Sequence, residues 1–273
     1  MRIAVALRFL PVAALLSLAS IASRATAAEA PSAQVRHDLE VRLDPEASTI
    51  EATDRLTFPL GIDRLAKTPS GGLEVRMHAA LDLESADPAW TVKPLAERKA
   101  PGGEEAAPDD LKLRTWELRP ASGAWPKDAA PRLRFQGKVF HPPVAELENY
   151  GRNFARSPGT IGPTGVVLTR STWWVPHVGE DLVSFRMAVD LPAGWDVVSQ
   201  GRRAERVVGE KGTHVVWDCV HPMEEIYLIA SKFAVYERPA GGFVALAYLR
   251  QPDPALAAKY LEATAQYVDL YRR

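Results

Sequence analysis

The chain reads VRHDLEVRLDPEASTIEATDRLTF from residue 35 to residue 58. Apolar and polar side chains alternate over its first ten residues, and the alternation resumes at Ile50. Because successive side chains of a β-strand point to opposite faces, this pattern predicts two strands, each with one buried face. His37 falls on the apolar face of the first strand. Residues 44–48 combine aspartate, proline and serine, which favour a turn, so residues 35–58 are expected to form an antiparallel hairpin.

Short strand patterns of the same kind continue to residue 249, with turn-forming residues between them. They are expected at residues 73–77, 90–92, 111–118, 133–139, 166–168, 185–191, 197–199, 207–208, 214–217, 226–236 and 243–249. Two irregular segments interrupt the series: residues 97–110, expected to form an exposed excursion of a hairpin, and residues 141–165, a long loop rich in proline and glycine. This succession predicts a mainly β fold, a saddle-like β-sandwich of antiparallel and mixed sheets.

A helical pattern follows the last strand. Asp253 can cap a helix that begins at Pro254, because its carboxylate accepts a hydrogen bond from the first turn and proline is favoured at the first helical position. One face of this C-terminal amphipathic helix then carries the following residues: Leu256, Tyr260, Leu261, Thr264, Tyr267, Val268 and Tyr271. No Gly, Asn or Pro closes the pattern. Since an apolar helix face must be buried, and the elements before it are expected to be strands, the helix is expected to pack on a further domain that this sequence barely begins.

The first 27 residues are predicted to be a signal peptide. Arg2 and Arg8 give a positive start, an apolar run covers residues 9–22, and residues 25–27 are small enough for a cleavage site. The run is shorter than the roughly 20 residues that span a membrane, so no stable membrane span is expected, with an uncleaved anchor as the alternative. The protein is therefore expected to be exported to the periplasm or the extracellular space, with residues 28–250 as the β-sandwich.

Composition and motifs exclude several classes of function. The net charge is −1 and the basic residues are scattered, so no nucleic-acid surface is expected. The single cysteine, Cys219, excludes an internal disulfide and is expected to be buried beside Trp217. The sequence holds no Gly-x-Ser-x-Gly elbow, no phosphate-binding glycine loop and no His-Glu-x-x-His zinc motif. No catalytic residue, metal ligand or bound cofactor is therefore predicted for this chain.

Two stretches place a histidine close to two carboxylates in the sequence. They are 177–181, with Glu180 and Asp181, and 221–225, with Glu224 and Glu225. Neither spacing fixes the geometry of metal ligands, so both stretches are expected to be solvated turns.

Trp173 and Trp174 stand between the long loop and a strand. If they lie on a strand, one ring is expected in the core and the other exposed or covered by a neighbour. Three roles stay open for them: core or interdomain packing, the lining of a substrate cleft, and stacking on a carbohydrate.

The order of these elements resembles the amino-terminal domain of the aminopeptidase N family, which are zinc metallopeptidases of the gluzincin type. Three stretches carry the resemblance: the hairpin at 37–58, the block at 165–201, and the strand at 226–236 with the helix that follows it. The block contains Gly-Val-Val-Leu at 165–168, Ser-Thr-Trp-Trp-Val-Pro at 171–176 and Leu-Pro-Ala-Gly-Trp at 191–195. The resemblance covers nearly all of residues 35–273.

That resemblance implies a domain that braces a thermolysin-like catalytic domain of the same polypeptide and forms one wall of a peptide cleft. The family's catalytic domain holds the zinc with a His-Glu-x-x-His helix and also carries a Gly-x-Met-Glu-Asn strand, and this sequence contains neither motif. The resemblance implies that residues 251–273 are the start of that catalytic domain, truncated here. The chain alone is therefore expected to bind no catalytic zinc and to cleave no peptide. Residues 141–176 are expected to face the peptide substrate, with these candidate cleft residues: Glu146, Glu148, Tyr150, Trp173 and Trp174.

The family's amino-terminal domain also contributes a Glu or Gln that holds the free amino terminus of the substrate. Here Pro163-Thr164 precede the 165–168 block and Arg170-Ser171-Thr172 follow it, without that acid or amide. The alternative function is a free-standing envelope β-sandwich module that binds a peptide, a glycan or a protein partner through residues 173–176. Such a module would bury its terminal helix on its own sheets, whereas a domain that docks a catalytic partner would leave Tyr260, Tyr267 and Tyr271 exposed.

Overall fold

The structure is a computed structural model, which describes residues 35–65, 67–100, 111–142, 157–179 and 182–272. The predicted signal peptide, residues 1–27, lies outside these ranges. Within them the chain is mainly β, with mixed and antiparallel sheets and a C-terminal helix, as the sequence pattern predicts.

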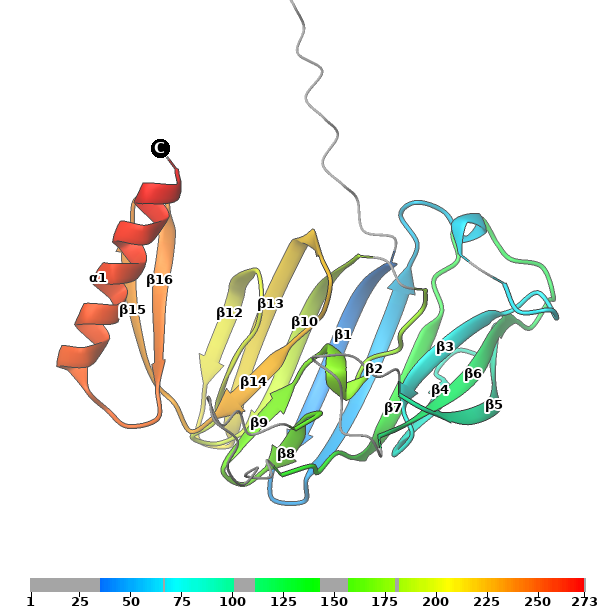
Figure 1. Cartoon of the computed structure of the whole chain (residues 1–273), viewed down its shortest axis with the longest axis horizontal. Helices are drawn as coiled ribbons and strands as arrows, with labels where there is room; N and C mark the ends of the chain where they lie inside the picture. Colours follow the sequence, from blue (N-terminus) through cyan, green and yellow to red (C-terminus); the bar gives the residue numbers. More distant parts are fainter. Residues whose placement is uncertain (1–34, 66, 101–110, 143–156, 180–181, 273) are drawn as a thin grey trace, which may run out of the picture. The chain divides into compact units, whose positions relative to one another are not determined.

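The largest sheet contains the predicted hairpin, formed by β1 (Val35–Asp44) and β2 (Thr49–Thr57). The Asp44 carboxylate closes the turn between them, because it accepts the backbone N–H groups of Glu46 and Ala47 at 3.0 Å each. The other strands of this sheet are β4 (Leu81–Ser85), β7 (Arg132–Lys138), β10 (Val183–Pro192), β12 (Arg202–Val208) and β13 (Gly212–Met223). They run in the order β12-β13-β10-β1-β2-β7-β4 (Figure 1), with β1 and β10 parallel and the other neighbours antiparallel.

Two smaller sheets share the core of the large one. One contains β8 (Thr160–Gly162), β9 (Gly165–Leu168), β11 (Asp196–Val198) and β14 (Leu228–Ser231), and the other contains β3 (Leu73–His78), β5 (Trp90–Lys99) and β6 (Lys112–Pro120). Two short 3₁₀ turns, η1 (Ile62–Arg64) and η2 (Arg170–Thr172), lie in the connections. A single cluster of buried side chains draws on all three sheets, with Phe135, Phe185 and Leu118 among its fully buried members. Burial of this apolar surface is what holds the sheets together.

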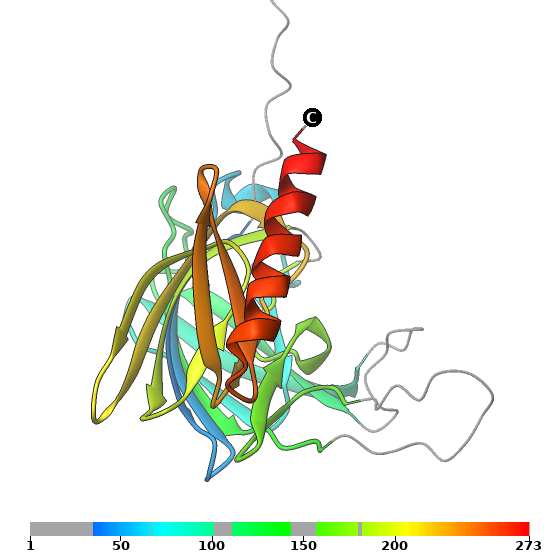
Figure 2. The same ribbon diagram turned by 90° about the vertical axis from the view of Figure 1, so that its left-hand side faces the viewer.

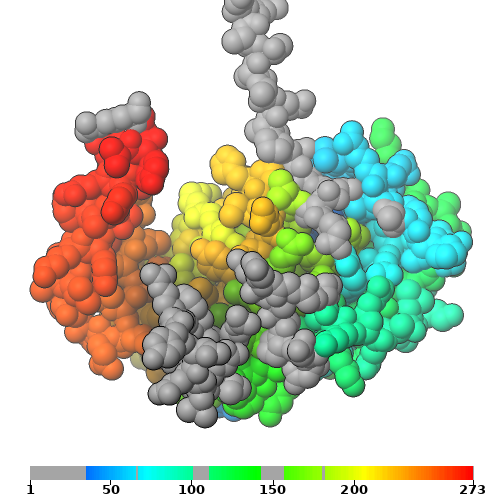
Figure 3. All heavy atoms as spheres, in the orientation of Figure 1, coloured from blue at the N-terminus to red at the C-terminus, as the bar shows by residue number. Residues whose placement is uncertain are grey.

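A second, smaller cluster lies at the C-terminal end. There α1 (Pro254–Tyr271) packs along the hairpin of β15 (Ala234–Ala240) and β16 (Phe243–Leu249), as Figures 1 and 2 show. The helix starts as predicted, with the Asp253 carboxylate accepting the Leu256 N–H at 2.9 Å. Ala257 and Leu261 are its buried side chains, and they meet small residues of β16. Figure 3 shows the helix, in red, at the surface of the molecule.

The strands differ in detail from those predicted. The strand expected at 226–236 breaks into β14 and β15, because the chain turns at Lys232 and the Phe233 N–H bonds the Ser231 carbonyl at 2.9 Å. Strand β5 continues to Lys99, into the segment expected as an excursion, whose residues 101–110 lie outside the described ranges. The short strands β4 and β8 were not predicted. Cys219 is buried on β13, as expected.

Candidate functional site

Trp173 and Trp174 do not lie on a strand, which corrects the sequence interpretation. They follow the 3₁₀ turn η2, which is tightened by a hydrogen bond of 3.0 Å from the Thr169 N–H to the Thr172 hydroxyl. Trp173 then takes the left-handed conformation, with φ 54° and ψ 40°. A bulky residue there is uncommon and marks a position that the surrounding structure holds in place.

The two indole rings have different environments. Trp174 is 1% exposed, and its Nε1 donates to the Ile226 carbonyl at 2.9 Å, so it belongs to the core. Trp173 is half-buried and touches the small cluster formed by Ala100, Leu111 and Leu113. One ring in the core and one covered by neighbours is the division that the sequence predicted, although a turn and not strand alternation produces it.

The side chains of Arg76 and His177 contact the Trp173 ring. The Arg76 guanidinium lies 5.3 Å from its centroid, and the His177 ring meets it edge-on at 4.8 Å. The backbones are tied as well, since Arg76 and His177 exchange two N–H···O bonds of 2.9 and 3.0 Å. The Trp173 carbonyl accepts the His78 N–H at 2.8 Å. Trp173 therefore joins strand β3 to the turn after η2, and cation–π and edge contacts restrict its ring.

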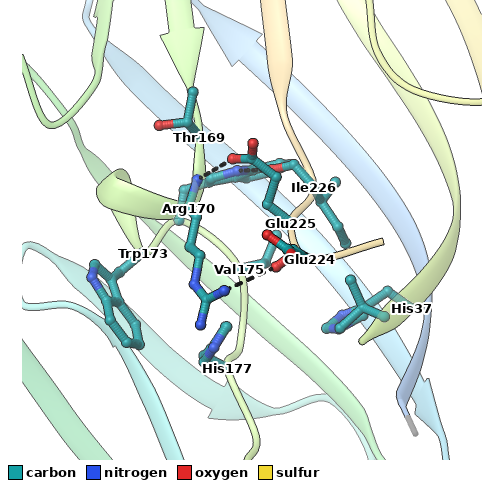
Figure 4. Close-up of a pocket in the computed structure, with 11 residues that line it drawn as sticks. His37, Thr169, Arg170, Trp173, Val175, His177, Glu224, Glu225 and Ile226 are labelled. Carbon is teal, nitrogen blue, oxygen red and sulfur yellow. Dashed lines mark hydrogen bonds between the residues drawn. The ribbon is translucent and has the colours of Figure 1, made fainter. Parts of the chain in front are cut away.

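A small pocket opens beside Trp173 (Figure 4). Its volume is about 20 Å³, which is room for a single water molecule. In Figure 4 the Arg170 side chain reaches toward His177, with Trp173 on one side and Glu224 and Glu225 on the other. The Glu225 carboxylate accepts the backbone N–H of Arg170 at 2.9 Å, which fixes the start of η2.

The inner part of this pocket is lined by His37 of β1. The His37 Nδ1 lies 2.7 Å from Oδ2 of Asp54 on β2, and both residues are buried. Burial raises the pKa of the Asp54 carboxyl, and the neighbouring His37 opposes that rise. Oδ1 of Asp54 has no partner among the described residues. The pair holds His37 in one orientation and joins the two strands of the hairpin through their buried faces.

The described residues do not form a site that fits a zinc ion. Within the described ranges, no three His, Cys, Asp or Glu side chains converge as metal ligands. The prediction of a turn at 221–225 is wrong for His221, which lies on strand β13, and Glu225 is bonded to Arg170. Glu180 and Asp181 lie outside the described ranges. His78 and His141 do approach each other, with their Nε2 atoms 2.8 Å apart.

The structure places part of the predicted cleft set. Glu146, Glu148 and Tyr150 lie outside the described residues, so only Trp173 and Trp174 are located, and only Trp173 borders solvent. The structure adds Arg76 and His177, which the sequence analysis did not connect with Trp173. Arg76 reaches the ring from strand β3, far away in the sequence, whereas His177 follows Trp173 by four residues. Across the described part of the chain, no helix is long and apolar enough to cross a bilayer.

Among the comparisons with known proteins, the one with solved structures gives matches. No family model and no curated protein matches the sequence. Solved structures similar to this chain include an aminopeptidase N family protein from Idiomarina loihiensis, with 10% identity, a TM-score of 0.48, and coverage of 87% of this chain and 37% of that one. An M1 zinc metallopeptidase from Deinococcus radiodurans bound to a Tyr-Ser-Ala substrate has 12% identity, a TM-score of 0.45, and coverage of 83% and 51%.

Native yeast LTA4 hydrolase is a third such structure, with 13% identity, a TM-score of 0.49, and coverage of 88% of this chain and 34% of that one. These neighbours are structures of the M1 aminopeptidase N family, the family that the sequence resembles. The chain spans between about a third and a half of the length of the structures it matches.

Proposed function

We propose that this chain is the non-catalytic amino-terminal domain of a secreted, aminopeptidase N-like zinc metallopeptidase. It braces a zinc-bearing catalytic domain and forms one wall of the peptide cleft. The observation that supports the proposal most is the apolar side of α1 that this chain leaves uncovered.

The helix has more apolar surface than the hairpin beneath it covers. Its buried side chains are Ala257 and Leu261. Five larger ones are exposed, with these exposed fractions: Leu256 37%, Tyr260 53%, Tyr267 63%, Leu270 64% and Tyr271 86%. Each tyrosine carries about 150–250 Å² of surface that gains free energy when buried. A contiguous apolar surface of this kind marks a site of contact with another protein part.

The small C-terminal cluster favours a large partner. Four buried residues form it, three of them alanines: Ala245, Ala247, Ala257 and Leu261. So small a core stabilises an element weakly, because little apolar area leaves water. We therefore assign the uncovered side of α1 to the catalytic domain that the resemblance implies. A free-standing binding module would bury Tyr260, Tyr267 and Tyr271 on its own sheets, which this chain does not do.

The cleft wall is assigned to the surface around Trp173. Its ring is half-buried, is restricted by Arg76 and His177, and sits beside Arg170 at the position where the family's acid or amide is missing. A restricted aromatic ring costs little entropy when it contacts a ligand. Glu146, Glu148 and Tyr150 are proposed to join this wall from the adjoining segment.

The coding sequence downstream of codon 273 tests the proposal directly. We expect a His-Glu-x-x-His motif within about 100 codons. A stop codon followed by unrelated sequence would contradict the proposal and favour the free-standing module. Stoichiometric zinc in the purified chain, measured by elemental analysis, would contradict the assignment of zinc to the partner domain.

The helix surface has its own test with matched variants. Tyr267→Lys places a charge on the apolar side of α1, whereas Ala258→Lys places the same charge on the exposed side that carries Glu262. We expect Tyr267→Lys to weaken co-purification with the catalytic domain at least about tenfold, the equivalent of about 1.4 kcal/mol. Ala258→Lys is expected to leave it unchanged. Equal effects of the two variants would exclude this side of the helix as the docking surface.

A further inference from the structure

His78 and His141 form a pair of directly hydrogen-bonded imidazoles. His78 is the last residue of β3 and is 5% exposed. Its Nε2 lies 2.8 Å from the Nε2 of His141, with the ring centroids 5.1 Å apart. The backbone N–H of Ala80 donates to the other ring nitrogen of His78, Nδ1, at 3.0 Å.

These contacts fix where the protons are. A neutral imidazole has one N–H and one acceptor nitrogen. Because Nδ1 of His78 accepts from Ala80, its proton is on Nε2, which donates to Nε2 of His141. Nε2 of His141 is then the acceptor, so the proton of a neutral His141 is on Nδ1.

The same contacts argue against a metal ion between the rings. A histidine that binds a metal through Nε2 donates its Nδ1 proton to a nearby acceptor. In His78 that position faces a donor, the Ala80 N–H, so a neutral His78 has no lone pair on Nε2 to offer a metal. The two Nε2 atoms are therefore joined by the proton of His78 and not by a metal ion.

We propose that the His78–His141 pair is a pH-controlled junction, in which both hydrogen bonds of His78 are made while the two rings are neutral and one of them is lost when the pair takes up one proton. The added proton must go to an acceptor nitrogen. On Nδ1 of His78 it replaces the bond from Ala80, and on Nε2 of His141 it sets two N–H donors against each other. Either way one of the two hydrogen bonds is lost.

The contact joins two parts of the fold that border Trp173. On one side is the end of β3, where the His78 N–H bonds the Trp173 carbonyl. On the other side is the connection from β7 to β8, where the His141 carbonyl accepts the Ser157 hydroxyl. Acidification therefore loosens the end of β3 beside the Trp173 turn, by the loss of either the Ala80 bond or the His141 bond.

The surroundings of His78 set the direction of the effect. Burial first, and the nearby charge of His141 second, lower the pKa of His78 to about 4. Among the described residues, the other titratable side chains on the segments packed here are mostly basic: Arg76 and His177 beside Trp173, and Lys112 and Arg114 on β6, with Arg114 held by Asp82 and Glu97. The unfolded chain takes up the proton more readily than the folded one. The contact therefore stabilises the fold above the ordinary histidine pKa of about 6.5 and is lost as pH falls toward 4.

Nitrogen-15 NMR of the histidine-labelled full chain tests the tautomers. At about pH 7.5, where both rings are predicted to be neutral, we expect an Nε2–H signal for His78 and an Nδ1–H signal for His141, unchanged by zinc or by a chelator. The spectrum of the His141→Gln variant identifies the His141 signal by its absence. An Nδ1–H tautomer of His78, or a stoichiometric shift with zinc, would overturn the proposal.

Urea unfolding of the wild type and His141→Gln at a series of pH values tests the consequence. Glutamine can accept the His78 Nε2–H but cannot be protonated, so the two proteins are expected to be similar at about pH 7.5. Between that pH and about pH 5, the unfolding constant of the wild type is expected to rise about tenfold more than that of the variant, as for a pKa shift of one unit. Parallel pH profiles would refute the contact as a pH-controlled one.

Discussion

Arg203 is expected to be the most sensitive single link between the large sheet and the C-terminal hairpin. It lies on β12, and its side chain is 11% exposed. Its guanidinium lies 2.6 Å from the Glu237 carboxylate on β15 and donates to the Tyr248 hydroxyl on β16 at 3.2 Å. Tyr248 also packs edge-on against Phe233, with the ring centroids 5.6 Å apart. Arg203→Met keeps most of the apolar stem and removes both polar links.

The expected loss of stability depends on how exposed the partners of Arg203 are. Breaking a buried ion pair by removing one member costs about 3–5 kcal/mol, because the other charge stays buried. The Glu237 side chain is 41% exposed and can regain water, so the cost here is smaller. Adding about 1 kcal/mol for the Tyr248 bond, we expect Arg203→Met to lower the free energy of unfolding by about 2 kcal/mol.

Urea unfolding of the full chain measures this loss, and Arg202→Met is the matched control. Arg202 is the preceding residue, is 75% exposed, and lies 3.9 Å from the Asp218 carboxylate. We expect its replacement to cost less than about 0.5 kcal/mol. A double-mutant cycle of Arg203→Met with Tyr248→Phe is expected to show about 1 kcal/mol of coupling. If Arg202→Met and Arg203→Met cost the same, the geometry around Arg203 has no special energetic role.

Three further predictions concern single side chains. Trp174→Ala is expected to lower the free energy of unfolding in urea by about 3–5 kcal/mol, and Trp173→Ala by about half of that, because Trp173 is only half-buried. A larger loss for Trp173→Ala would contradict the core assignment of Trp174. Asp253→Ala removes the cap of α1 and is expected to cost about 1 kcal/mol, seen as faster hydrogen exchange in the first turn of α1 with β1 unchanged as the internal control. The Asp54→Asn variant should gain stability relative to the wild type as pH rises above about 4, because a raised carboxyl pKa makes ionisation of Asp54 costly in the folded state. A difference in free energy of unfolding between the two proteins that stays constant with pH would refute this.

The sequence predicted the sheets well because their side chains repeat locally. The period of two placed Val35, Leu39 and Ile50 correctly, since a strand's buried face depends on its own residues. The same period of two also indicates the His37–Asp54 pair. Both residues fall on the inward faces of the hairpin, where a polar side chain needs a partner.

The candidate site could not be predicted in the same way, because its contacts cross long stretches of sequence. Trp173 follows the turn η2 and meets Arg76 of strand β3, and His78 meets His141 across 63 positions. Their approach depends on how β3, η2 and the β7–β8 connection pack, and no local period encodes that packing. The left-handed turn at Trp173 is likewise set by its tertiary contacts, since bulky residues avoid that conformation.

The apolar pattern predicted for helix α1 is right, but the prediction that it forms a single face is wrong. The sequence places Leu261, Tyr260 and Tyr267 on one face, yet Leu261 is buried while both tyrosines are more than half exposed. At about 100° per residue, Tyr260 and Tyr267 share a side that is roughly 100 to 120° away from Leu261. A surface helix has one apolar stripe, whereas a helix that is apolar on two sides belongs between two layers. The β15–β16 hairpin is one of those layers, and we propose that the catalytic domain is the other.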